Sequence, residues 1–448
     1  MVALVTNLGM STHATDEEEV ASRALFNNPG TLNAATPGEA DLETVSRAIA
    51  EIELLRASFL DEEGNAAYPD WYGGVYINQD FRAVVMVTYL NRSILSYIME
   101  VTGNTDVLLR EVRHSHAEIL RTLDVLSDNV ALFGDYLSTI SLDDFENRIY
   151  IGIRVDNQHS MRSSNMMESI EENMVRQFES ATSGLFRQLG IDPAMIAYEF
   201  VAELPIQETP DEIGAQDECL DALSIQPTTI TVRPGQLVRA GTAGPNGSLA
   251  YRAIRNGEVG YTASGHVFTF AGQWAYVPGV NGRFNRLGQV RYSTNPYANQ
   301  TGTLEADVAF IHVAHIVEGY HMNRTNEIAH TTGRRHNTVA ITPTAGLPIA
   351  FSGHSSGYRT GQITRSSVHI VGTLRPNGRL NLRNQFAMSM TGIQGDSGGI
   401  VHAISSANEP AGVVVGSGWE LLGQGNTGSV FSVASSSVRI AQRNIHPH

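Results

Sequence analysis

The sequence contains no lysine, a single cysteine and no apolar run long enough to span a bilayer. Cys219 alone cannot form an intramolecular disulfide, so stability must come from packing. The absence of lysine would protect the chain from lysine-directed cleavage, although biased genomic composition is the simpler explanation. The net charge of −16 argues against a nucleic-acid partner, which requires a basic surface.

Several other signals are missing. The first twenty residues lack a basic segment followed by a sustained apolar stretch, so they do not predict an intact secretory signal. No metal-ligand spacing, Walker loop or dinucleotide fingerprint is present, and we therefore expect no metal and no cofactor. A chain of 448 residues is too long for one ordinary core, so two domains joined by a linker are expected.

The segment Gly395-Asp396-Ser397-Gly398-Gly399 predicts a nucleophilic serine. Glycines on both sides allow a tight turn that presents the Ser397 hydroxyl and leaves neighbouring amides free to bind an oxyanion. An ordinary hairpin turn has a similar composition. The segment therefore predicts catalysis only together with a base and an orienting acid.

Two upstream segments contain candidates for that base and that acid. Thr262-Ala263-Ser264-Gly265-His266 follows a predicted strand and ends in a histidine, although one of 15 histidines could equally be a core or surface residue. Asp307 stands at the start of an apolar run, and Glu305 lies two residues before it. Two residues apart on a strand share a face, so spacing alone leaves both carboxylates open as the acid.

Together the three segments resemble the chymotrypsin-like serine peptidases of the trypsin, streptogrisin and α-lytic type. The signatures of that family look like TAxxH or TAGH, D[IV]A and GDSGG, in this chain order. The resemblance implies a serine endopeptidase with His266 as base, Asp307 as orienting acid and Ser397 as nucleophile. It implies an oxyanion hole formed by the backbone amides of Gly395 and Ser397. It also favours Asp307 over Glu305, because the acid of the family is followed directly by Val/Ile-Ala.

The same register implies which residues bind the substrate side chain next to the cleaved bond. They are Thr391, Gly392, Val415, Gly416, Ser417 and Gly418. Because these residues are small and neutral, we expect a modest, uncharged side chain there. Glu420 lies close enough in sequence to leave a basic side chain open as an alternative.

Two positions depart from the family pattern. Many secreted relatives carry a cysteine next to the catalytic histidine, where this chain has Val267. In streptogrisin-like relatives an arginine before a GSTTG-like stretch holds the acid that precedes the nucleophile, here Asp396. This chain has Phe351 in that place, with Arg359 as a possible replacement.

The N-terminal part predicts an α+β domain preceded by a loosely ordered arm over residues 1–40. Apolar positions predict a helix from Leu42 to near Gly64. Residues 71–77 and 83–88 predict a hairpin, Ser115 begins a second helix with capping-box spacing, and residues 148–155 alternate as a strand. A Met-rich helix with the stripe Met167, Ile170, Met174 and Phe178 follows.

Parts of this region resemble the pro-region of α-lytic and streptogrisin-type bacterial peptidases. The similar pieces are YGGVYINQDFRAVVMVT, EVRHSHAEILRTLDVL and FENRIYIGIRV. The resemblance implies that residues 41–203 assist folding and inhibit the protease until they are removed. Residues 204–227 are acidic, contain proline and lack periodicity, which predicts a linker and places the processing site there.

From residue 228 to 448 the pattern changes to short strands separated by turn signals, typical of an all-β domain. Asn256-Gly257, Asn281-Gly282 and Asn377-Gly378 are hairpin signals. The family fold implies two six-stranded β-barrels, one up to about residue 340 with His266 and Asp307, the other with Ser397. The site would lie in the cleft between them.

There are three alternatives to this prediction. A catalytically silent protease-like binding domain would normally have lost a triad residue, whereas all three are present here. A different serine hydrolase would show a Gly-x-Ser-x-Gly elbow on alternating strands and helices, and this pattern is absent. An active protease with a permanent N-terminal regulatory or targeting domain stays open. We expect protein or peptide substrates, an intramolecular partner in the N-terminal domain, no membrane span, and secretion.

Overall fold

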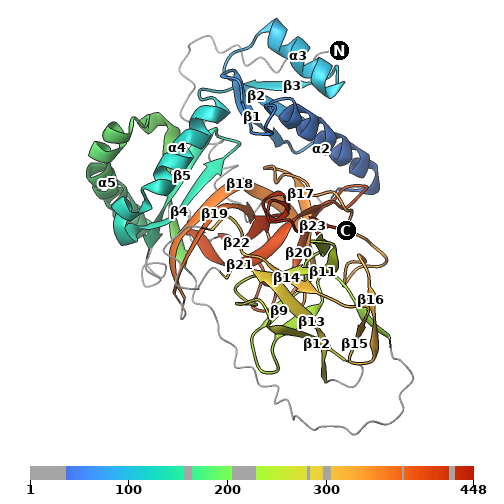
Figure 1. Cartoon of the computed structure of the whole chain (residues 1–448). Helices are drawn as coiled ribbons and strands as arrows, with labels where there is room; N and C mark the ends of the chain where they lie inside the picture. The colour runs from blue at the N-terminus through green and yellow to red at the C-terminus, as the bar shows by residue number, and fades with distance from the viewer. Residues whose placement is uncertain are drawn as a thin grey trace.

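The computed structural model describes residues 37–155, 164–203, 229–279, 283–295, 304–375, 378–422 and 429–448 (Figure 1). Residues 1–36 of the predicted arm and the whole predicted linker at 204–227, with its expected processing site, lie outside the described residues. The Asn281-Gly282 signal also lies outside them.

The first helix, α2 (Leu42–Ala57), begins where the periodicity predicts it, after a short 3₁₀ turn, η1 (Glu39–Asp41). Its predicted apolar side, including Val45 and Ile52, is buried. The predicted end near Gly64 is wrong. The helix stops at Ala57 because the chain turns back, and the Ala67 amide donates to the Phe59 carbonyl at 2.7 Å.

A three-stranded sheet follows α2. The predicted hairpin is confirmed as β1 (Tyr72–Ile77) and β2 (Ala83–Val87), which pair antiparallel. Helix α3 (Arg92–Thr102) then returns the chain so that β3 (Leu108–Glu111) pairs parallel with β2. α3 and β3 were not predicted from the sequence.

A second group of elements continues the N-terminal half. Ser115 caps α4 (His116–Asp128) as predicted, and its hydroxyl accepts a hydrogen bond from the Glu118 amide at 3.2 Å. The alternating segment is confirmed as β5 (Arg148–Val155) and the Met-rich segment as α5 (Ser164–Leu189). Of the predicted stripe on α5, Phe178 is buried and Met174 partly buried, while the side chains of Met167 and Ile170 lie outside the described residues.

Two strands in this group were not predicted. They are β4 (Leu137–Asp143), which follows the 3₁₀ turn η2 (Val130–Tyr136), and β6 (Ile196–Glu203), which follows η3 (Pro193–Met195). β4 pairs antiparallel with β5, and β5 pairs parallel with β6.

The C-terminal half is rich in strands. The first strands form an eight-stranded sheet in the order β23-β10-β11-β14-β13-β12-β8-β9. Its members are β8 (Leu237–Ala240), β9 (Asn246–Ser248), β10 (Arg252–Arg255), β11 (Glu258–Ala263), β12 (Trp274–Pro278), β13 (Phe284–Ser293), β14 (Ala309–His312) and β23 (His446–Pro447). A small separate sheet contains β7 (Thr229–Val232), β15 (Ile316–Val317) and β16 (Tyr320–Arg324).

The hairpin signal at Asn256-Gly257 is confirmed. These two residues connect β10 to β11, and their φ angles of 51° and 80° are the left-handed values that this type of two-residue turn requires. The signal at Asn377-Gly378 lies between β18 and β19, which pair antiparallel. Their last pair is Arg375↔Gly378, and residues 376 and 377 lie outside the described residues.

Six later strands pair into a closed ring. They are β17 (Pro348–Gly353), β18 (Gly357–Arg375), β19 (Gly378–Met388), β20 (Ile400–Ala403), β21 (Pro410–Leu422) and β22 (Ser429–Ser436). The order β17-β20-β21-β22-β19-β18 is closed by the additional pairing of β17 with β18. After β22, helix α6 (Ser437–Ala441) carries the chain back to β23, so the last residues rejoin the first sheet instead of the second.

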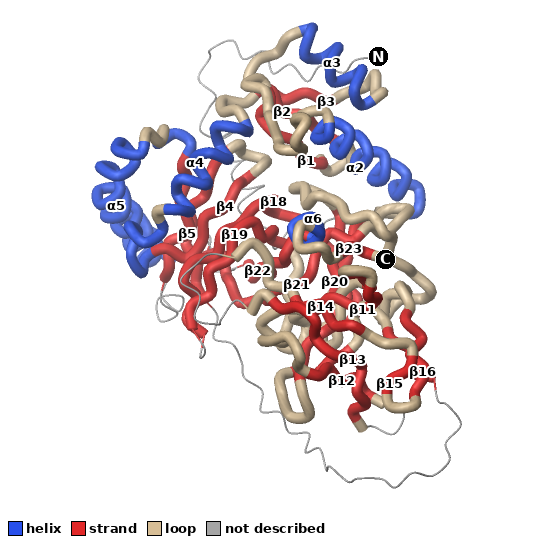
Figure 2. Tube along the Cα trace, viewed as in Figure 1, coloured by secondary structure: helices blue, strands red, loops and turns tan. Residues whose placement is uncertain are grey.

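Strands of the N-terminal half extend this second sheet (Figure 2). β4 pairs antiparallel with β18, and β6 pairs antiparallel with β21. Arg365 on β18 reinforces the junction through ion pairs with Glu199 at 3.0 Å and Asp143 at 3.6 Å. The N-terminal half is therefore joined to the C-terminal half by continuous backbone pairing at two edges.

The first group of N-terminal elements, α2, β1, β2 and α3, also contacts the second sheet. Its buried residues form one apolar cluster with Leu347 and Ile349, and α2 lies beside β17 in Figure 1. The Ile77 amide donates to the Ala345 carbonyl at 2.9 Å. A Cβ on Gly346 would lie 1.8 Å from the Ile77 oxygen, so only glycine permits this approach.

The packing around Gly152 on β5 predicts a destabilised variant. A Cβ at this position would lie 2.1 Å from Thr139 Oγ1 and 2.8 Å from Val201 Cγ2, both buried in the junction. Gly152→Ala should lower the free energy of unfolding by about 1–3 kcal/mol, measured by urea denaturation. Gly184→Ala is the matched control, because nothing lies within 4 Å of its Cβ and alanine favours the helix. Equal stability of the two variants would contradict the packing argument.

His369 predicts how the junction responds to acid. It lies on β18 opposite Ile140 of β4, and burial lowers its pKa from 6.5 to about 4, with Arg383 lowering it further and Asp128 opposing. Between pH 6.5 and about pH 4, His369 therefore binds a proton in the unfolded chain but not in the folded chain. The contribution of His369 to stability is therefore complete above the unfolded pKa and is lost as the pH falls.

Between pH 6.5 and pH 5, wild type should lose about 2 kcal/mol more unfolding free energy than His369→Leu. Urea denaturation of both proteins at the two pH values measures the difference. Equal losses would show that His369 does not carry this dependence.

Candidate active site

Two paired strands bring His266 and Asp307 to one end of the first sheet. β11 and β14 are antiparallel with Ala263 opposite Ala309. His266 follows the end of β11, and Asp307 precedes the start of β14. In an antiparallel pair the end of one strand lies beside the start of the other, so the two residues meet.

The Asp307 carboxylate is completely buried and binds His266 twice. Its Oδ2 contacts the ring Nδ1, and its Oδ1 accepts a hydrogen bond from the His266 backbone amide at 2.8 Å. The His266 side chain is 17% exposed, so the ring lies at the edge of the buried region. The carboxylate thus fixes the orientation of the ring and assigns Nδ1 as the donor to Asp307.

Glu305, the alternative acid, lies elsewhere. Its side chain is 44% exposed and pairs with Arg439 at 4.0 Å, and Asn384 donates to its Oε1 at 3.4 Å. The Asp307 amide instead donates to the buried Ser435 hydroxyl at 2.9 Å. A bend between residues 305 and 307 therefore turns one carboxylate outward and the other to His266.

The glycine of the TASGH segment has a steric reason. A Cβ on Gly265 would lie 2.6 Å from Thr294 Oγ1 and 3.0 Å from Asp307 Oδ1. Thr294 is itself fixed, because its hydroxyl donates to the Val308 carbonyl and accepts from the Val308 amide. Any larger residue before His266 would displace the carboxylate.

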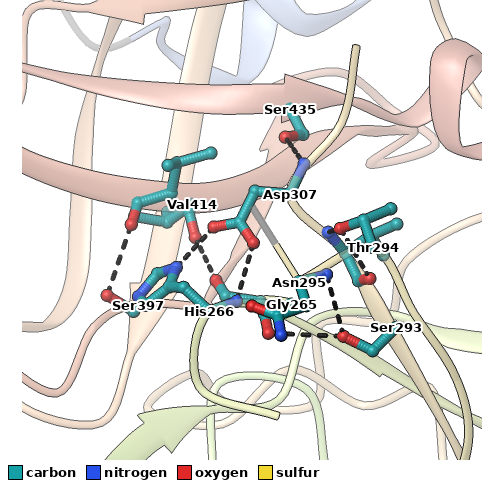
Figure 3. Close-up of polar contacts among 12 residues, drawn as sticks. Gly265, His266, Ser293, Thr294, Asn295, Asp307, Ser397, Val414 and Ser435 are labelled. Atoms are coloured by element: carbon teal, nitrogen blue, oxygen red, sulfur yellow. Dashed lines mark hydrogen bonds and ion pairs between the residues drawn. The ribbon is translucent and has the colours of Figure 1, made fainter. Parts of the chain in front are cut away.

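Ser397 comes from the turn before β20, on the second sheet. Its Oγ donates to the Val415 carbonyl at 3.3 Å, and Figure 3 draws the His266 ring between Ser397 and the Asp307 carboxylate. Gly398 has φ of +90°, and a Cβ there would lie 2.2 Å from the Ser248 oxygen. This contact explains the glycine that follows the serine.

The predicted oxyanion amides belong to the same turn. Within the described part of the chain, no group accepts a hydrogen bond from the amide of Gly395 or Ser397. Gly395 has φ of +94°, which favours glycine, and a Cβ there would lie 2.3 Å from Ser355 Oγ. The two amides are therefore available for a ligand.

The predicted specificity residues lie on neighbouring segments of the second sheet. The Gly392 amide donates to the Ser432 hydroxyl at 2.8 Å, and Ser432 is the strand partner of Ser417. Val415 is buried, and Gly416 pairs with Val433. Thr391 adjoins Gly392 in the chain, and Gly418 lies within β21, where the positions of its neighbours' side chains are outside the described residues. The same limit applies to the side chain of Glu420.

Asp396 is held by neutral donors instead of an arginine. Its Oδ1 accepts from the amides of Ser355 and Ser356 at 2.9 Å each, and its Oδ2 accepts from the Ile393 amide at 2.8 Å and from the Ser356 hydroxyl. Arg359 is not among these partners, so the proposed replacement is wrong. The two serines were not predicted as partners of Asp396, although they lie in the GSTTG-like stretch.

The described residues contain no cluster of histidine, cysteine or carboxylate side chains suited to a metal ion. None of the helices in these segments is both long and apolar enough to cross a membrane.

Residues 37–112 match the family model described as Pro-like N-terminal domain. This segment is therefore similar to Pro-like N-terminal domains. The predicted resemblance of the N-terminal half to a pro-region is confirmed over these residues.

A search of curated proteins finds no match. Among solved structures, a chymotrypsin from Cellulomonas bogoriensis is 20% identical with a TM-score of 0.34, covering 49% of this chain and 99% of its own. The Nocardiopsis protease NAPase is 17% identical with a TM-score of 0.35, covering 49% of this chain and 100% of its own. Protease A from Thermobifida fusca is 14% identical with a TM-score of 0.34, covering 48% and 98%. All three names are those of proteases.

The environment of Asp396 predicts the effect of removing its charge. In Asp396→Asn an amide NH₂ would face donors that now bind the carboxylate, leaving at least one of them unpaired. The variant should lose about 1–3 kcal/mol of unfolding free energy in urea denaturation. Arg359→Ala, which removes an exposed side chain, should match wild type. A larger loss in the arginine variant would show that Arg359 supports Asp396 after all.

Proposed function

We propose that the chain is a serine endopeptidase that hydrolyses peptide bonds through His266, Asp307 and Ser397. The observation that carries the proposal is the buried Asp307 carboxylate, which binds both the amide and Nδ1 of His266. A completely buried carboxylate is costly unless it has a partner, and here its partner is a histidine beside the glycine-flanked serine. An ordinary core histidine would not need this arrangement.

The reaction would proceed through an acyl-enzyme. Ser397 Oγ turns from the Val415 carbonyl to His266, whose Nε2 takes its proton as Oγ attacks the peptide carbonyl carbon. The amides of Gly395 and Ser397 donate to the resulting oxyanion. His266 then gives the proton to the leaving amine, and water hydrolyses the ester by the same steps. Asp307 stabilises the imidazolium without taking its proton.

Substrate recognition would use the second sheet. Thr391 and Gly392 on one side and Val415, Gly416, Ser417 and Gly418 on the other would line the pocket beside the cleaved bond. The Ser432 hydroxyl supports this assignment, since it binds Gly392 while its residue pairs with Ser417. The small residue types favour a modest, uncharged side chain in the substrate.

The architecture in the proposal is a double six-stranded barrel of the chymotrypsin type over residues 228–448. The closed order of β17 to β22 supports the second barrel. Residues 41–203 would be an α+β pro-region, and residues 204–227 the linker that is cut. We also propose that the enzyme is secreted as a zymogen, by analogy with the proteases it resembles.

One observation favours a second candidate, a permanent N-terminal regulatory domain. α2 shares an apolar cluster with the second sheet, and β4 and β6 pair with its strands. An interface of this kind would persist after the linker is cut unless the N-terminal half is digested.

The intact mass after expression and storage tests self-processing. Wild type should shorten to a fragment that begins between about residues 204 and 234, a range that covers the predicted linker and β7. Ser397→Ala should stay whole, because it lacks the nucleophile, and should hydrolyse no peptide substrate.

If both proteins stay whole, autoprocessing is excluded. Labelling of Ser397 by a fluorophosphonate then separates the two remaining cases. A labelled wild type would be an active protease with a permanent N-terminal domain, whereas an unlabelled one would contradict the proposed catalysis.

A further inference from the structure

Ser248 lies where the first sheet meets the nucleophile turn. It is the last residue of β9, an edge strand of the eight-stranded sheet, and it is completely buried. No sequence motif singled it out, and neither the proposed triad nor the proposed specificity residues include it.

Three hydrogen bonds connect Ser248 to the second sheet. Its amide donates to the Ser397 carbonyl at 2.7 Å, and its hydroxyl donates to the Gly395 carbonyl at 2.7 Å. The hydroxyl also accepts from the His354 amide at 2.8 Å. Because a hydroxyl has one proton, this amide contact directs that proton to Gly395.

These bonds fix the backbone on both sides of the nucleophile. The peptide unit that follows Gly395 is held by Ser248 at its oxygen and by the Ile393 carbonyl at its N–H, 3.0 Å away. The unit that follows Ser397 is held by Ser248 at its oxygen and by the Val414 carbonyl at its N–H, 2.8 Å away.

Gly395 makes this support important. At φ of +94° its backbone occupies a region from which a glycine can move at little cost. Without the Ser248 hydroxyl, the Gly395 carbonyl would be buried with one fewer donor, and a rotation of this residue would turn its amide away. The amides of Gly395 and Ser397 would then no longer converge on one point.

We propose that Ser248 is a positioning residue for the oxyanion hole. From the first sheet, its hydroxyl holds the Gly395 carbonyl and thereby the orientation of the two oxyanion amides. This inference rests on the proposed serine-protease function. Ser248 touches no reacting atom through its side chain, so its effect should fall on the transition state and not on substrate binding.

The test uses the full chain, allowed to process itself, and the variant Ser248→Ala. With a peptide p-nitroanilide carrying a small apolar residue before the cleaved bond, kcat should fall about 10- to 100-fold while KM stays unchanged. The affinity for the corresponding peptide aldehyde should fall by the same factor, because its tetrahedral adduct places an oxyanion in the hole. A purely structural role would lower the active fraction without changing this affinity.

Ser352→Ala is the matched control. Ser352 is also completely buried, and its hydroxyl donates to the Ala329 carbonyl at 2.9 Å, away from residues 395–397. This variant should lose similar stability but keep the kcat and aldehyde affinity of wild type. An equal loss of both in Ser352→Ala would overturn the inference, as would a folded Ser248→Ala with wild-type values.

A second variant covers the case in which Ser248→Ala does not fold. Ser248→Cys keeps the side-chain shape but replaces the hydroxyl with a weak donor, so kcat should fall with KM unchanged. Wild-type kcat in folded Ser248→Cys would overturn the inference. Failure of the proposed function itself would look different, since wild type and Ser397→Ala would then be equally inactive and unlabelled by a fluorophosphonate.

Discussion

The buried Asp307 carboxylate sets the conditions for the whole site. A carboxylate that is removed from water must be satisfied by nearby donors, and here His266 supplies two donors, its backbone amide and its ring Nδ1. This is possible only because the pairing of β11 and β14 places the two residues at one strand end, and because Gly265 has no Cβ. The Ser435 hydroxyl ties the same segment to the second sheet. The geometry of the site therefore depends on the pairing of β11 with β14, on the glycine at position 265 and on the hydrogen bond from Asp307 to Ser435.

The turn that contains Ser397 depends on a corresponding set of conditions. Asp396, beside Ser397, is buried and held by four neutral donors from residues 355, 356 and 393. An anion held by backbone amides and a hydroxyl is fixed in direction more strictly than one held by a flexible arginine, since the donors lie on short, packed segments. The absence of the expected arginine thus removes a cation from the site without leaving the carboxylate unsatisfied.

The candidate site residues could be proposed from the sequence because they lie in short local motifs. Local spacing could not separate Asp307 from Glu305, which share a predicted strand face. The distinction depends on a bend before β14 and on the position of Arg439. Ser248 was beyond prediction for a similar reason, because its partners at 354, 395 and 397 are distant in sequence and carry no pattern that refers to it.

In the fold, too, elements with a local sequence signal were predicted more readily than elements set by distant residues. Helices α2, α4 and α5 follow from apolar periodicity, and Ser115 predicts the start of α4. α3 was missed although Asn91 caps it, with its side chain accepting from the Ser93 amide. β4 and β6 were missed because their pairing with β18 and β21 is non-local.

That non-local pairing connects the two halves of the chain physically. β6 ends at Glu203, which pairs with Trp419 on the strand that also contains Val415 and Gly416. The last described residues of the N-terminal half are therefore hydrogen-bonded to the strand whose earlier residues adjoin Ser397. Separating the halves would expose unpaired edges of β18 and β21 together with the apolar cluster around Leu347. Any process that frees the C-terminal half must therefore replace this backbone pairing with water or with another strand.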